Sequence, residues 1–192
     1  MFDCSERLTM FDASRYEVRQ KLRIGNKYNV YEEGTDDPIL ESAQKKFRLK
    51  EDFRFDDPAS GEERFRVKAD SVLDVAASYD IVDSQSGDRL GSVKRSVKSF
   101  FKHEYALVDP NGTVVANVKE DSWLRAILRR NVTTLVPFSY DIEGPNGEQF
   151  GAVSGKFTPV RDKYTIDLSG DGQLDPRLAV IGTVVVDAIE EN

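Results

Sequence analysis

The chain has 192 residues, 39% of them hydrophobic and 10% aromatic, which is typical of one globular domain and excludes a wholly disordered chain. Its formal net charge of -7 argues against nucleic acid as a partner, because phosphate binding requires clustered cations. No apolar run approaches the roughly 18 to 20 residues that a membrane-spanning helix needs, so we expect no transmembrane segment.

The start of the sequence and its cysteine content predict a cytoplasmic protein. The first residues lack the charged-then-apolar pattern of a secretion signal, and we expect residues 1–14 to form a flexible segment. Residues 15–192 are expected to form a single domain. Cys4 is the only cysteine, so no disulfide can form within the chain, which fits a reducing compartment.

A recurring phrase predicts β-hairpins. Each copy reads tyrosine, any residue, an aliphatic residue, an acidic or turn residue, a Gly-containing turn and a second alternating run. The copies begin at Tyr28, Tyr79, Tyr105 and Tyr140. The tyrosine and the aliphatic residue two positions later share one face of a strand, because side chains alternate along it. Repeated hairpins protect their edges best in a closed barrel or stacked sheets.

Two segments depart from this β pattern. Residues 123–131, after Asp121 and Ser122, have apolar residues at helical spacing and predict a short amphipathic helix. Further on, Asp175 is a good helix N-cap and Pro176 a good first helical residue. The residues that follow are apolar on all sides, as in a helix buried in a core. The β-branched run 184–186 would also suit a buried strand, but the cap favours a helix over residues 175–190.

The order of these features resembles the LURP-one-related family of the Tubby C-terminal-like superfamily, which is related to the phospholipid scramblases. The resemblance covers about residues 15–190 and is carried by YEVRQKLRIGNKYNVYEE, YDIVDSQSGDRLGSVKR and KYTIDLSGDGQLDPRLAVIGTVVVDAIEE. It implies a mainly β fold, a closed antiparallel barrel of about twelve strands around a buried hydrophobic C-terminal helix. It also implies association with lipids and no enzymatic reaction. The chain lacks the Cys-rich cluster of the scramblases, and we do not expect lipid scrambling.

No catalytic centre is recognisable, so we expect neither enzymatic activity nor a cofactor. His103 is the only histidine, and nothing in the sequence places it beside Cys4, as a nucleophile and its base would require. A transition-metal site would need more histidine or cysteine ligands than the chain contains.

One acidic segment resembles a calcium-binding loop. Asp167, Ser169 and Asp171 offer oxygen donors at alternate positions before a glycine, as in an EF-hand. The bidentate glutamate that closes such a loop is replaced by Leu178. The segment therefore predicts either a calcium site or an acidic turn before the last helix, and the turn is favoured.

Basic clusters beside aromatic residues predict a site for an anionic ligand. The candidate ligand-binding residues are Lys94, Arg95, Lys98, Lys102 and His103, together with Arg125, Arg129 and Arg130. Lys45, Lys46, Arg48 and Lys50 form a further cluster. Such cations can hold phosphate headgroups while an aromatic side chain enters the membrane interface. The alternative is that these cations form a solvated strand face without a ligand, which the acidic composition favours.

These observations predict a non-enzymatic binding module in the cytoplasm, with peripheral membrane association as one form of its action. Its partner would be an anionic lipid headgroup. The alternative is a protein-interaction or structural module without a small ligand. The sequence does not predict the oligomeric state.

Overall fold

The computed structural model describes residues 9–21, 27–42, 53–69, 78–95, 104–120, 139–156, 163–170 and 173–190. These residues form a short 3-10 helix, twelve β-strands and one α-helix. In chain order, the elements are η1 (Thr9–Phe11), β1 (Arg15–Lys21), β2 (Lys27–Glu32), β3 (Leu40–Ser42), β4 (Phe53–Asp56), β5 (Glu63–Ala69), β6 (Ser78–Asp83), β7 (Arg89–Arg95), β8 (Glu104–Val108), β9 (Val114–Glu120), β10 (Ser139–Glu143), β11 (Gln149–Lys156), β12 (Lys163–Asp167) and α2 (Pro176–Glu190).

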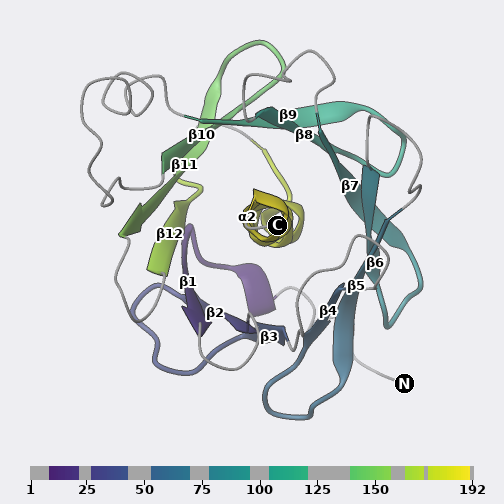
Figure 1. Ribbon diagram of the computed structural model, residues 1–192, viewed down its shortest axis with the longest axis vertical. Helices are drawn as coiled ribbons and strands as arrows, with labels where there is room; N and C mark the ends of the chain where they lie inside the picture. The colour runs from purple at the N-terminus through teal and green to yellow at the C-terminus, as the bar shows by residue number, and fades with distance from the viewer. Residues whose placement is uncertain are drawn as a thin grey trace.

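The strands form one closed barrel that surrounds α2 (Figure 1). Each strand pairs antiparallel with the next strand in the chain, and β1 closes the barrel against β12. The four predicted hairpins are present as β2–β3, β6–β7, β8–β9 and β10–β11. The prediction of a mainly β, closed antiparallel barrel around a C-terminal helix is confirmed.

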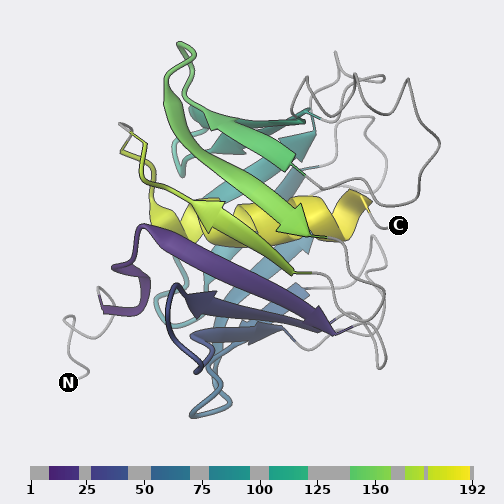
Figure 2. The ribbon, with the colours of Figure 1, turned by 90° about the vertical axis from the view of Figure 1, so that its left-hand side faces the viewer.

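The two ends of the barrel are distinguished by the direction of α2, which runs from one end to the other (Figure 2). We call the end where α2 begins the N-terminal rim and the end where α2 finishes the C-terminal rim. The turns 33–39, 57–62, 84–88, 109–113 and 144–148 all lie at the N-terminal rim. Even-numbered strands begin and odd-numbered strands end at the C-terminal rim.

Tyrosine and the aliphatic residue two positions later do face the barrel interior together. This confirms the shared face predicted from the repeats, and two further pairs, in β1 and β12, follow the same rule. All of the pairs are buried: Tyr16 and Val18, Tyr28 and Val30, Tyr79 and Ile81, Tyr105 and Leu107, Tyr140 and Ile142, Tyr164 and Ile166. The interior is therefore a layer of rings and branched side chains wrapped around α2.

The predicted cap starts α2. The backbone N–H of Arg177 donates to Asp175 Oδ1 (2.9 Å), and the N–H of Ala179 donates to the Asp175 carbonyl (3.0 Å). The helix is buried without interruption over residues 178–188. The β-branched run 184–186 lies within it, so the strand alternative is wrong. Burial on every side outweighs the low helix propensity of valine. No helix in the described ranges is long and apolar enough to cross a membrane.

The described structure begins before β1. Phe11 of η1 is buried, and its ring packs against those of Tyr16 (5.8 Å between centroids) and Phe65 (6.2 Å). The domain boundary at residue 14 stays a prediction, and the structure places this phenylalanine among the core residues.

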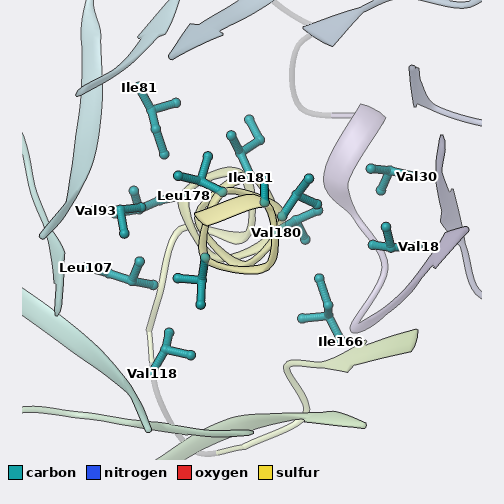
Figure 3. Close-up of a cluster of buried hydrophobic side chains, with 14 of the residues drawn as sticks. Val18, Val30, Ile81, Val93, Leu107, Val118, Ile166, Leu178, Val180 and Ile181 are labelled. Atoms are coloured by element: carbon teal, nitrogen blue, oxygen red, sulfur yellow. The ribbon is translucent and has the colours of Figure 1, made fainter. Parts of the chain in front are cut away.

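The helix packs against β6, β7 and β8, and Ile81, Val93 and Leu107 of these strands lie around it (Figure 3). Two glycines lie at this contact, where a Cβ would come very close to other atoms. A Cβ on Gly91 of β7 would lie 2.5 Å from the carbonyl oxygen of Val108 and 2.8 Å from the side chain of Leu178. A Cβ on Gly182 of α2 would lie 2.8 Å from the side chain of Leu107. A methyl group should be tolerated less well at Gly91 than at Gly182. The side chain of Leu107 can rotate away, whereas the carbonyl of Val108 is held by the sheet.

We expect Gly91→Ala to lower the free energy of unfolding by about 2 to 3 kcal/mol through overpacking. Gly182→Ala should change it by about 1 kcal/mol or less, because Leu107 can adjust and alanine favours the helix. Urea denaturation of both variants and the parent measures the difference. Equal losses would show that the carbonyl of Val108 is no harder to displace than the side chain of Leu107.

Candidate functional site

Five buried tyrosines surround α2 near the C-terminal rim. Each is the second residue of its strand, and all of these strands begin at this rim. They are Tyr28, Tyr79, Tyr105, Tyr140 and Tyr164. We call this set the tyrosine ring. The hydroxyls of Tyr105 and Tyr140 lie near Glu190, in the last turn of the helix.

Polar groups of the barrel and helix contact the tyrosine ring. The amide of Gln20, at the end of β1, donates to the hydroxyl of Tyr28 (3.3 Å). The hydroxyl of Tyr105 donates to a carboxylate oxygen of Glu190. Burial raises the pKa of Tyr105 and of Tyr140, and the nearby carboxylate of Glu190 raises both further. These phenols therefore stay neutral, and they act as hydrogen-bond donors rather than as bases or nucleophiles.

Cations without an ion pair gather at the same rim. Most described Lys and Arg side chains are paired with carboxylates, as in Arg15 with Asp167 (2.7 Å). Among the side chains that the structure describes, the cations that make no ion pair are Lys27, Lys68, Lys94 and Arg95. All four are exposed, and each lies within two residues of the strand end at the C-terminal rim.

The N-terminal rim has the opposite charge. Its described turns and the segment before α2 contain acidic residues and, within those ranges, no Lys or Arg. The acidic residues are Glu33, Asp36, Asp37, Asp57, Glu62, Asp88, Asp109, Glu148 and Asp175. The described barrel is thus acidic at one end and carries its unpaired cations at the other.

The structure describes two of the predicted ligand-binding residues. Lys94 and Arg95 are the last residues of β7, and both are exposed. The other candidates lie outside the described residues: Lys98, Lys102, His103, Arg125, Arg129 and Arg130. The basic cluster of residues 45–50 and the amphipathic helix predicted over residues 123–131 also lie outside them.

Alternation along β7 turns Lys94 and Arg95 to opposite sides of the barrel wall. Arg95 shares the inward face with Val93 and stands next to Tyr105 of β8 in the register. Its charge lowers the pKa of Tyr79 and Tyr105, against the larger effect of burial. Arg95 therefore lies near the tyrosine ring, and Lys94 is on the outer surface.

The oxygens of Asp167 are occupied by protein groups. Oδ1 accepts the backbone N–H of Ser169 (2.9 Å) and its hydroxyl (2.5 Å), and Oδ2 accepts Nε of Arg15 (2.7 Å). The Ser169 hydrogen bonds and Arg15 lower the pKa of the Asp167 carboxyl. Asp171 lies outside the described residues, so the calcium site stays a prediction. Within the described ranges, no three His, Cys, Asp or Glu residues cluster so as to hold a metal ion.

Comparison with known proteins agrees with this architecture. A family model described as LURP-one-related matches residues 39–187, more than half of the chain. An X-ray structure of a protein from Arabidopsis thaliana superposes with a TM-score of 0.54, over 95% of this chain and 94% of that one. The two sequences are 14% identical, so this likeness concerns the fold alone. No curated protein matches the chain.

Proposed function

The chain belongs to the LURP-one-related family, and from this membership and the charge of its C-terminal rim we propose a non-enzymatic module that binds an anionic phospholipid headgroup. The observation that carries the proposal is the position of the unpaired cations. Lys27, Lys68, Lys94 and Arg95 are exposed without a carboxylate partner among the described residues, and all four lie at this rim.

Unpaired cations favour an anionic ligand more than paired ones do. An arginine already paired with a carboxylate must break or share that pair to bind a phosphate, whereas a free cation attracts it directly. The acidic N-terminal rim adds orientation, since an anionic membrane attracts one end of the barrel and repels the other. The cytoplasmic leaflet, which carries anionic lipids, is the surface that we expect the protein to meet.

The positions of the other predicted cations in the sequence also favour a binding site at the C-terminal rim. The predicted residues beyond Arg95 fall in the sequence between β7 and β8 and between β9 and β10. Those four strands end or begin at the C-terminal rim. Across all the sequence segments that join strand ends at this rim, Lys and Arg outnumber Asp and Glu. The tyrosine ring supports binding over catalysis, because burial and the carboxylate of Glu190 raise the pKa of Tyr105 and of Tyr140 and keep both hydroxyls protonated at neutral pH.

We expect Lys94→Glu combined with Arg95→Glu to reduce flotation with vesicles containing phosphatidylserine or phosphoinositide by at least about tenfold at physiological salt. Two favourable contacts of about 1 kcal/mol each become repulsive. Vesicles of phosphatidylcholine alone should float neither protein. The salt concentration must be fixed, because headgroup attraction is screened within about 8 Å at physiological ionic strength.

A matched control distinguishes the effect of charge at the C-terminal rim on flotation from the effect of the protein's net charge. Arg15→Glu with Arg89→Glu makes the same change in net charge at the starts of β1 and β7, which lie at the N-terminal rim away from the unpaired cations, and both arginine side chains are at least one third exposed. This control should keep more than half of the parent's flotation, and both variants should melt cooperatively. Equal losses in both double variants, or none in either, would refute headgroup binding at the C-terminal rim.

A further inference from the structure

A groove of about 410 Å³ opens at the N-terminal rim. Three segments far apart in the sequence form its walls: the β6–β7 turn, the β8–β9 turn and the residues before α2. Its volume falls within the range of ligand pockets, roughly 300 to 1,000 Å³. The groove lies at the opposite end of the barrel from the unpaired cations, so what it binds is independent of the proposed headgroup site.

The groove has an apolar floor. Leu90, Val115, Leu174 and Leu178 contribute aliphatic side chains to its lining, together with the ring of Pro110. Except for Leu178, these leucine and valine side chains are only partly buried, so their apolar surface is accessible from the groove. A ligand that fits must bring apolar groups to this floor.

The two arginines at the groove are already engaged. Arg89 binds Asp80 (3.1 Å), the hydroxyl of Ser92 (3.1 Å) and the carbonyl of Pro110 (3.4 Å). Arg177 pairs with Asp175 (2.7 Å). Neither guanidinium is therefore available to neutralise the remaining acidic residues of the walls.

Besides the buried Asp83, two carboxylates in the walls make no ion pair with any residue that the structure describes. Asp88 closes the β6–β7 turn, and Asp109 opens the β8–β9 turn. Asp109 Oδ1 accepts the backbone N–H groups of Asn111 (2.9 Å) and Thr113 (2.7 Å), and these bonds hold the pKa of Asp109 below its usual value. Its charge is therefore present at neutral pH, beside an apolar floor where a cation would be attracted.

We propose that this groove docks a basic segment of a partner protein, with a Lys or Arg side chain between Asp88 and Asp109 and an apolar neighbour on Leu90 and Leu174. Charge complementarity selects the occupant: apolar floor and acidic walls match a cationic, amphipathic segment. Such a segment would dock through side chains, because each described strand of the closed barrel pairs on both sides and offers no free edge for strand addition. A second copy of the chain fits less well, since each copy carries a net charge of -7.

The test uses a fluorescein-labelled peptide of alternating leucine and arginine, titrated with the full chain at about 0.15 M salt, where general electrostatic attraction is screened. Asp88→Asn with Asp109→Asn should weaken its binding at least tenfold, because both carboxylates are removed while asparagine can keep the turn. Asp36→Asn with Asp37→Asn removes the same charge from the β2–β3 turn, outside the groove, and should weaken binding less than twofold. A peptide with glutamine in place of arginine should bind at least tenfold more weakly.

Several results would overturn the proposal. Equal weakening by the two double variants would indicate general attraction to an acidic protein. Equal binding of the glutamine peptide would show that charge plays no part. Displacement of the peptide by an equal concentration of butylammonium would indicate a small organic cation, and a dimer that Asp88→Asn with Asp109→Asn dissociates would indicate a second copy. Vesicle flotation should be unchanged in both double variants, which keeps this test separate from that of the headgroup site.

Discussion

The chain shortened to residues 1–174 is expected to give no soluble product that melts cooperatively. The truncation removes α2, and with it the fully buried side chains of Val180, Ile181, Val184, Val185 and Val186. Burial of one such side chain contributes about 1.5 to 3 kcal/mol, whereas a whole domain is stable by about 5 to 15 kcal/mol. The barrel would also expose the inner faces of its strands to water.

Expression of residues 1–174 beside the full chain, followed by thermal denaturation monitored by circular dichroism, measures this effect. The full chain should show one transition. A soluble truncated barrel with its own sharp transition would contradict the role of α2 as the centre of the core.

Ile181→Asp is expected to unfold the domain at neutral pH without any truncation. Ile181 is fully buried on α2, and an unpaired carboxylate at this depth costs several kcal/mol, roughly the stability of a domain. Ile181→Val is the matched control, and it should cost only about 0.5 to 1.5 kcal/mol through a small cavity. Urea denaturation of the three proteins gives the comparison.

The pH dependence of this variant has a definite sign. Burial would raise the pKa of the new aspartate above its value in the unfolded chain, because it disfavours the charged form. The folded state would then hold the proton more tightly, so the loss relative to the parent should shrink as the pH falls towards 4. A loss that stays constant or grows between pH 7 and pH 4.5 would show that the carboxylate reaches water.

Local patterns predicted most of the fold. The spacing of tyrosine and an aliphatic residue predicted strand faces, because alternation is a property of the strand alone. Asp175 and Pro176 predicted the start of α2 for the same reason, since capping involves neighbours in sequence. The repeated phrase did not include Tyr16 and Tyr164, although they obey the same spacing. Arg19 stands where the phrase has an acidic or turn residue, and a helix rather than a second strand follows the glycines after β12.

The arrangement of charges could not be predicted in the same way. Whether an arginine is paired depends on strands that meet only in the barrel, as Arg15 of β1 meets Asp167 of β12. Lys94 and Arg95 were selected for their local density, while their lack of a carboxylate partner depends on the fold. The groove at the N-terminal rim was missed because its walls come from turns around Asp88, Asp109 and Asp175, each of which looks like an ordinary acidic turn alone.

The position of α2 after all of the described strands bears on biosynthesis. A ribosome makes β1 first, yet the strand that closes the barrel against β1 appears only after ten others, and the helix that fills the barrel follows that strand. Until then, the nascent chain has strand edges without partners and apolar faces without a covering, which are the surfaces that aggregate and that chaperones bind. Because its decisive contacts join distant parts of the chain, folding should be slow and should follow translation of the last helix rather than accompany it.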